Sequence, residues 1–139
     1  MKIFYTDGSC SPNPGPGGWS VVEDKGPVAY GFAPDSTNIR MEGQALIAAM
    51  ALADGEPVTI KTDSEFWINV LTKWAPGWSA KGWKKKSGPI KNLDLVQEAF
   101  ELYQNSQATL VWVKAHVGTD GNELADEWAN KARLEKIEL

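Results

Sequence analysis

The amino-acid sequence predicts a mixed α/β fold in which helices cover one sheet. Three strand-like segments follow one another near the N-terminus, two more occur later, and segments with helical periodicity lie between them. At roughly 150 residues per domain, the 139 residues predict a single domain over residues 1–139. A content of 42% hydrophobic and 23% charged residues excludes a disordered chain.

The N-terminal part of the chain predicts three strands in an antiparallel meander. Lys2–Thr6 mixes apolar and β-favouring side chains and leads into a turn signal at Asp7–Ser9. Ser11–Gly18 contains too much proline and glycine for regular structure. Trp19–Glu23 and Val28–Ala33 are then the second and third strands.

Helices and strands alternate in the rest of the chain. Asn38 is the predicted N-cap of a helix that ends at Gly55. A strand at Val58–Thr62 precedes a short helix at Glu65–Lys73, and a fifth strand covers Thr109–Lys114.

Two further helices lie before and after that fifth strand, and the last one opens with a capping-box pattern at Asp120 and Glu123. Apolar residues at helical spacing are expected in the core. They are Met41, Ala45, Ala49 and Leu52 in the first helix, Leu93, Val96, Phe100 and Tyr103 in the third, and Leu124, Trp128 and Ala132 in the last.

Several classes of protein are excluded by composition. The longest apolar run, Ala45–Ala53, is far shorter than the roughly 20 residues that a bilayer demands. The N-terminus turns polar before a signal-peptide core could form. The single cysteine, Cys10, can form neither an internal disulfide nor a Cys-rich zinc site. We therefore expect a soluble protein of a reducing compartment, the cytoplasm.

The charge distribution indicates a nucleic-acid partner although the net charge of −4 does not. Residues 73–91 contain six lysines and no acidic residue, so the rest of the chain carries −4 − 6 = −10. The lysines are Lys73, Lys81, Lys84, Lys85, Lys86 and Lys91, and three of the seven tryptophans lie among them. We call residues 73–91 the basic insert.

Four acidic residues stand out by their predicted location. Asp7 and Asp63 end strands, Glu42 lies in the first turn of its helix, and Asp126 lies near the start of the last helix, off its apolar stripe. Strand ends and neighbouring helix starts are where sites collect in open α/β sheets. Each acid taken alone is more often a residue that forms a turn or favours a helix dipole. Spacing does not show whether the four converge.

The order and spacing of the polar motifs resemble type 1 ribonuclease H over nearly the whole chain. The motifs are Thr6-Asp7-Gly8-Ser9-Cys10, Asn13-Pro14-Gly15-Pro16-Gly17-Gly18, Asn38-x-Arg40-Met41-Glu42, Thr62-Asp63-Ser64, Trp112-Val113-Lys114-x-His116 and Gly121-Asn122-Glu123-x-x-Asp126. The resemblance implies a ribonuclease H-like fold with a five-stranded mixed sheet, three antiparallel strands followed by two parallel ones. It also implies a basic helical protrusion at the basic insert.

The implied activity is endonucleolytic hydrolysis of the RNA strand of RNA–DNA hybrids by two-metal-ion catalysis, leaving 5′-phosphate and 3′-hydroxyl ends. The family's metal-binding carboxylates carry over onto Asp7, Glu42, Asp63 and Asp126, and its flexible-loop histidine onto His116. Carboxylates without cysteine or histidine ligands suit Mg²⁺, with Mn²⁺ as a substitute. We expect two ions when substrate is bound.

A further set of residues resembles the family's hybrid-binding positions. Lysines neutralise phosphates without reading sequence, and indole rings can pack against sugars. The set is Cys10, Asn13, Asn38, Glu65, Trp74, Trp78, Trp83, Lys84, Lys85, Lys86 and Asn92. The tryptophans could instead anchor the basic insert to the body. Glu65 replaces the family's usual glutamine and Ile39 a common asparagine, which predicts weaker hybrid binding or an altered cleavage preference.

The sequence alone leaves two alternative functions open. One is a DNA-directed nuclease of the same fold superfamily, and the other is a hybrid-binding module without catalysis. Metal-dependent cleavage of hybrid against duplex DNA discriminates among the three. We expect a monomer with no membrane contact, no obligate protein partner and no separate N-terminal hybrid-binding domain.

Overall fold

The computed structural model describes residues 2–85, 88–114 and 120–138. Its centre is a five-stranded sheet in the order β3-β2-β1-β4-β5. The strands are β1 (Lys2–Cys10), β2 (Gly15–Glu23), β3 (Gly26–Ser36), β4 (Pro57–Thr62) and β5 (Gln107–Trp112). β1, β2 and β3 pair antiparallel, whereas β4 pairs parallel with β1 and with β5. The predicted fold class is therefore confirmed.

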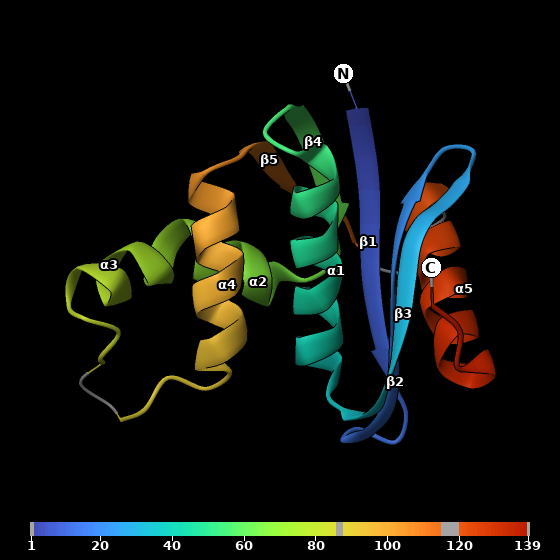
Figure 1. Ribbon diagram of the computed structural model, residues 1–139, viewed down its shortest axis with the longest axis horizontal. Coiled ribbons are helices and arrows are strands. Elements are labelled where there is room, and N and C mark those ends of the chain that lie inside the picture. Colours follow the sequence, from blue (N-terminus) through green and yellow to red (C-terminus); the bar gives the residue numbers. More distant parts are fainter. Residues whose placement is uncertain (1, 86–87, 115–119, 139) are drawn as a thin grey trace.

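Helices cover both faces of the sheet. They are α1 (Asn38–Ala53), α2 (Glu65–Asn69), the π-helical turn η1 (Val70–Trp74), α3 (Ala75–Ala80), α4 (Leu93–Gln104) and α5 (Asp120–Glu135). Figure 1 shows α1 between the sheet and α4, with α3 farther out and α5 on the opposite face of the sheet. None of the helices in the described ranges is long and apolar enough to cross a bilayer.

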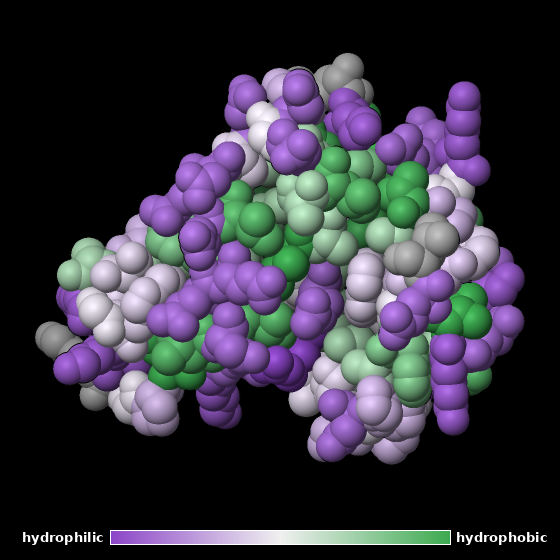
Figure 2. Space-filling model, viewed as in Figure 1, coloured by the Kyte–Doolittle hydropathy of each residue, from purple (hydrophilic) through white to green (hydrophobic). Residues whose placement is uncertain are grey.

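The main core lies between the sheet and α1, with α4 and the α2–η1 segment packed around it. Phe4, Ile60 and Leu46 are buried there, and Trp67 from α2 is fully buried beside them. On the outer surface of α1 and α4, apolar surface is interspersed with hydrophilic side chains (Figure 2). The sheet and these helices share one hydrophobic core, which holds the ends of the strands in place.

The prediction that Asp7 ends the first strand is wrong. β1 continues to Cys10, because β2 still pairs with it from Asp7 to Cys10 after the β1–β4 ladder has ended at Thr6. Pairing with β1 at Gly17 and Gly18, and with β3 at Gly15, makes residues 15–18 part of β2, although their glycine and proline content predicted irregular structure. Cross-strand pairing has overridden local propensity here.

The first long helix also differs in detail from its prediction. Its N-cap is Thr37, whose hydroxyl accepts a hydrogen bond from the Arg40 N–H, so Asn38 is the first helical residue. Glu42 consequently lies beyond the first turn. Leu52 was expected in the core but is 44% exposed, and Ala53 is buried instead.

The remaining differences concern element ends and packing faces. The helix predicted at Glu65–Lys73 continues through η1 and α3 to Ala80, and the fifth strand ends at Trp112, earlier than expected. In α5 the small residues Ala125 and Ala129 are buried, whereas Leu124 and Trp128 are only half-buried. Small residues face the sheet because α5 packs close to β1, β2 and β3.

Two glycines allow helices to lie against β1 on both of its faces. A Cβ at Gly8 would collide with the α1 backbone at Met41 and Glu42, and one at Gly121 would collide with the ring of Tyr5. Because side chains alternate along a strand, Tyr5 and Asp7 face α5, whereas Gly8 faces α1. β1 therefore sits between a helix that carries Glu42 and a helix that carries Asp126.

We predict that Gly8→Ala destabilises the protein by about 2–3 kcal/mol, as in other overpacked sites, because the added methyl group meets backbone that cannot move aside. Gly77→Ala in α3 is the matched control. Nothing lies within 4 Å of a Cβ at Gly77, so the change should be neutral or stabilise by about 0.5–1 kcal/mol. Urea unfolding midpoints measure both. Equal midpoints for the two variants would contradict the close approach of α1.

Candidate active site

Three carboxylates from separate elements meet beside the end of the β1–β4 ladder. Asp7 lies within β1, Asp63 directly follows β4, and Glu42 projects from α1. One ligand oxygen from each lies within 4.8 Å of those of the other two. The parallel pairing of Thr6 with Thr62 places Asp7 and Asp63 side by side, and the contact at Gly8 brings Glu42 to them.

The fourth predicted acid, Asp126, reaches the same place from α5. Its carboxyl group lies close enough to that of Asp7 to contribute, after burial and the charge of Asp63, to the raised pKa of Asp7. Asp126 lies outside the group of three whose oxygens are all within 4.8 Å of one another. The four acids therefore form a compact group of three with Asp126 adjoining it through Asp7.

Burial and mutual repulsion raise the pKa values in this group. The pKa of Asp7 is raised to about 9, first by burial and then by the charges of Asp63 and Asp126. The pKa of Glu42 is raised to about 7 by burial and by the charge of Asp63. Like charges held this close favour a bound cation that neutralises them.

The chemistry of the donors selects the class of cation. All the ligand atoms are carboxylate oxygens, which are the ligands of hard divalent cations such as Mg²⁺ and Mn²⁺. Thiolate and imidazole ligands, which zinc prefers, are absent from the described group. The residues present therefore fit Mg²⁺ or Mn²⁺.

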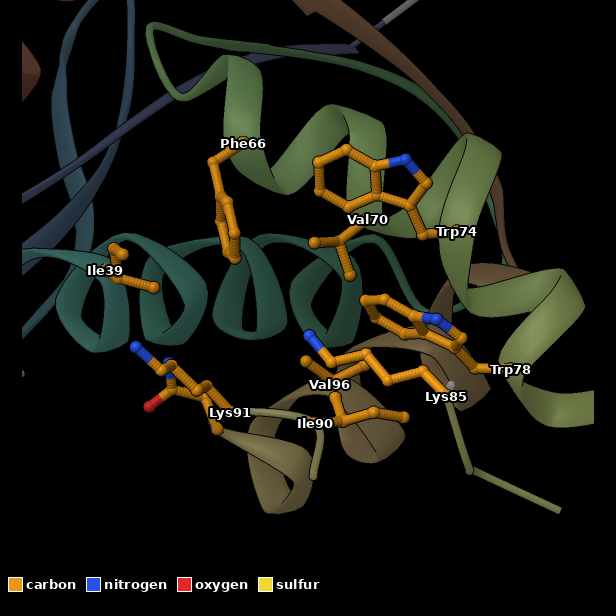
Figure 3. Close-up of a pocket in the computed structure, with 10 residues that line it drawn as sticks. Ile39, Phe66, Val70, Trp74, Trp78, Lys85, Ile90, Lys91 and Val96 are labelled. Carbon is orange, nitrogen blue, oxygen red and sulfur yellow. The ribbon is translucent and has the colours of Figure 1, made fainter. Parts of the chain in front are cut away.

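A second feature of the structure is an apolar channel beside α1, with a volume of about 480 Å³. Figure 3 shows Phe66, Trp74 and Trp78 along one side and Ile90 with two lysines along the other. Phe66 and Trp74 are 37% and 42% exposed, although both are large and aromatic. Such a channel with a basic rim suits a polyanion that also presents flat, less polar groups.

Comparison with known proteins identifies the family of this chain. The RNase H family profile matches residues 1–133. The chain belongs to the ribonuclease H family. This family consists of nucleases that act by hydrolysis, so the chain is an enzyme of the hydrolase class.

Individual relatives are similar over almost the whole chain. Ribonuclease H of Pseudomonas paraeruginosa is 43% identical, with 96% of this chain aligned to 93% of that protein. Ribonuclease H of Methylorubrum extorquens is 40% identical over 97% of this chain, which spans only 61% of that longer protein. Among solved structures, the crystal structure of LC9-RNase H1, a type 1 RNase H with the type 2 active-site motif, is similar with a TM-score of 0.84 and 30% sequence identity. The superposition covers 98% of this chain and 73% of the LC9-RNase H1 chain.

Three of the residues predicted to bind substrate are brought together at the tip of β1. The Cys10 N–H donates to Oδ1 of Asn38 at 2.7 Å, and the Asn38 N–H donates to Oδ1 of Asn13 at 3.1 Å. Cys10 itself is buried, and its thiol contacts backbone carbonyl groups, so the thiol does not face solvent. Whether these ribonuclease H positions touch substrate stays a prediction.

The basic insert contributes residues of two kinds. Trp83 packs edge-on against Phe100 with ring centroids 5.8 Å apart, so it anchors the insert to α4. Trp78 borders the channel, with Nζ of Lys85 at 5.9 Å from its ring. Lys84 and Lys85 are exposed. Lys86 and His116 lie outside the described residues.

Of the remaining predicted positions, Asn92 lies at the channel and Glu65 lies outside the residues that line it. Asn92 lines the channel and accepts a hydrogen bond from Arg40 at 3.2 Å. Arg40 also forms a salt bridge with Asp94 at 2.7 Å, which joins α1 to α4, and this hydrogen bond lowers the pKa of Asp94 to about 2. Glu65 is exposed at the start of α2.

Sequence reasoning did not assign several residues that support this site. The Ser64 side chain lies next to Glu42, and its hydroxyl accepts a hydrogen bond from the Trp67 N–H, so Ser64 lies between that carboxylate and the start of α2. Trp112 donates Nε1 to the Asp63 carbonyl at 3.3 Å. The Ser64 position could have been found as an N-cap directly after Asp63, whereas the Trp112 contact has no local sequence signal.

We predict that the metal-free protein loses stability as pH rises. The pKa of Asp7 is raised from 3.8 to about 9 and that of Glu42 from 4.5 to about 7, so folding favours their protonated forms. The stability that these protonated forms contribute is complete below the ordinary pKa values of 3.8 and 4.5. It is lost as pH rises through the raised pKa values of about 7 and about 9. Asp7→Asn should therefore be more stable than the wild type in chelator, by a margin that grows between about pH 5 and about pH 8.5.

Thermal unfolding with chelator and with Mg²⁺ measures this effect. At roughly ten times its dissociation constant, Mg²⁺ should stabilise the wild type by about 1.4 kcal/mol, and Asp7→Asn should lose most of that gain. Parallel pH profiles for the two proteins in chelator would show that Asp7 does not experience the charges of its neighbours.

Proposed function

We propose that this ribonuclease H family member hydrolyses the RNA strand of RNA–DNA hybrids with two divalent cations, Mg²⁺ or Mn²⁺. The observation that carries the proposal is the convergence of Asp7, Glu42 and Asp63 within 4.8 Å, in a chain of this family. Residues 1–139 would act as a single catalytic domain and as a monomer. The products would carry 5′-phosphate and 3′-hydroxyl ends.

The four acids would hold the cations. Asp7 and Asp63 lie where both cations could be bound, and Glu42 and Asp126 would each complete the ligands of one. When bound, the cations supply an activated water and neutralise the charge that develops on the leaving oxygen. Ser64 restrains the Glu42 carboxylate. His116 would serve as an accessory group that transfers protons or assists product release.

The substrate would lie across the site and the channel. Exposed lysines of the basic insert would neutralise phosphates, and the rings of Trp74 and Trp78 would pack against sugars of the DNA strand. Cys10, Asn13 and Asn38 would contact the RNA strand near Glu42. Recognition of the 2′-hydroxyl is what allows a protein to distinguish RNA from DNA. Phe66 extends the aromatic surface beyond the residues that the resemblance supplied.

We predict that Asp63→Asn lowers the cleavage rate by about a hundredfold or more while the hybrid still binds. An amide cannot supply the charge that holds the cations, and several kcal/mol of transition-state stabilisation depend on them. Cleavage of labelled hybrid and of duplex DNA is measured in Mg²⁺ and then in chelator. The control is Asp24→Asn in the turn between β2 and β3, which should cleave as the wild type does. Substantial activity of Asp63→Asn in Mg²⁺ would rule out the proposed ligand set.

A second prediction concerns the basic insert. Replacing Lys84 and Lys85 by alanine should raise KM more than it lowers kcat, because these charges hold ground state and transition state alike. The slope of log affinity against log salt should become shallower by about one to two units. The matched control replaces Lys2 and Lys25 by alanine. These exposed lysines lie at the other end of β1 and in the β2–β3 turn, so the control removes the same charge outside the basic insert. An unchanged slope in the Lys84 and Lys85 variant would place the binding surface elsewhere.

A further inference from the structure

A row of polar residues on α5 faces β1. Asn122, Asp126, Asn130 and Arg133 recur at intervals of four, four and three residues, which places them on one side of the helix. The buried alanines of the same helix lie beside this row. Only Asp126 of the four has a role in the proposed function.

The row lies in register with one face of β1. Two residues of a strand rise by about 6.6 Å and four residues of a helix by about 6 Å, so the two elements stay in step. Asp7 of β1 accordingly lies beside Asp126 of α5. Two residues farther along β1, Ser9 contacts Asn130, which lies four residues farther along α5. The side chains that surround Asp126 are therefore set by how α5 lies along β1.

Asn130 is held by two donors on its oxygen. Ser9 Oγ donates to Asn130 Oδ1 at 2.6 Å, and Nη2 of Arg133 donates to the same atom at 3.1 Å. Nε of Arg133 also donates to Ser9 Oγ at 3.2 Å, which closes a triangle of three side chains. Because a guanidinium group has only donors, the Asn130 atom that faces it is the oxygen.

This orientation determines what Asn130 presents to Asp126. With Oδ1 occupied, the amide nitrogen points along the helix and donates to Asp126 Oδ1 at 3.4 Å. The bond restrains the carboxylate that adjoins Asp7. The amide is neutral, so it restrains Asp126 without competing with the cation for charge.

We propose that Asn130, fixed by Ser9 and Arg133, is a positioning residue that orients the Asp126 carboxylate for cation binding next to Asp7. The inference rests on the proposed function, in which Asp126 is a cation ligand. Docking of α5 alone does not require this triangle, since Ser20 Oγ already donates to the Ala125 carbonyl at 2.6 Å and ties the helix to β2. That second contact supplies a control on the same helix.

The test compares Asn130→Leu with Ser20→Ala. Asn130→Leu keeps the approximate size of the side chain and removes the donor, whereas Ser20→Ala removes a bond between α5 and the sheet that does not involve Asp126. Mn²⁺ affinity is measured by calorimetry without nucleic acid, together with the melting temperature of each variant. Cleavage of hybrid is then measured as a function of Mg²⁺ and of hybrid concentration.

We expect Asn130→Leu to bind Mn²⁺ about tenfold more weakly, the low end of the range for residues that orient metal ligands. Its kcat should recover in part at high Mg²⁺, with an unchanged KM for hybrid. Ser20→Ala should melt at a lower temperature but bind Mn²⁺ as the wild type does. Arg133→Leu should weaken Mn²⁺ binding to a smaller extent, since Ser9 still orients the amide, and Arg133→Lys should restore it.

The Arg133 variants keep the inference testable if Asn130→Leu does not fold. Wild-type Mn²⁺ affinity in Asn130→Leu, or in Arg133→Leu where only that protein folds, would overturn it. So would an equal loss of affinity in Ser20→Ala, which would assign the effect to helix docking. A wild type that neither binds Mn²⁺ nor cleaves hybrid would instead overturn the proposed function itself, and the inference with it.

Discussion

The placement of β1 between two closely packed helices is the constraint on which the rest of the site depends. Gly8 admits the α1 backbone on one face, and Gly121 lets α5 approach Tyr5 on the other. β4 adds Asp63 from the side, because its parallel ladder with β1 ends one residue before Asp7. Each acid arrives on a different element, and β1 packs against all of those elements. A shift of β1 by one residue would turn Asp7 to the opposite face of the sheet.

Gathering these carboxylates opposes folding in the absence of a cation. Burial and mutual repulsion raise the pKa of Asp7 to about 9, which is a free-energy cost at neutral pH. The packed core of Phe4, Leu46 and Ile60 contributes the stability that offsets this cost. The same distribution of charge suits binding, because clustered carboxylates favour cations and the exposed lysines of the basic insert favour a polyanion. The candidate site is thus a place where the fold gives up stability.

Most elements could be predicted from local patterns, and the errors have physical causes. The Asp7–Ser9 turn signal was overridden by pairing with β2, which continues after β4 has ended. Leu52 was assigned to the core from helical spacing, but its side chain is 44% exposed, and the next residue, Ala53, is buried instead. In α5 the close approach to the sheet selected alanines over the larger Leu124 and Trp128. Spacing gives the face of a helix only approximately, because the neighbouring elements decide how it is rotated.

The sequence by itself determined the order of the elements, the charge separation and the identity of the candidate carboxylates, because periodicity, turn chemistry and motif spacing are local properties. It could not show that Asp7, Glu42 and Asp63 lie within 4.8 Å of one another, nor that Asp126 contacts Asp7. The support from Ser64 and Asn130 likewise became visible only in three dimensions. Only the tertiary structure decided these contacts. The residues concerned are separated by up to 121 positions along the chain, as for Ser9 and Asn130, and meet because strand pairing and helix packing bring them together.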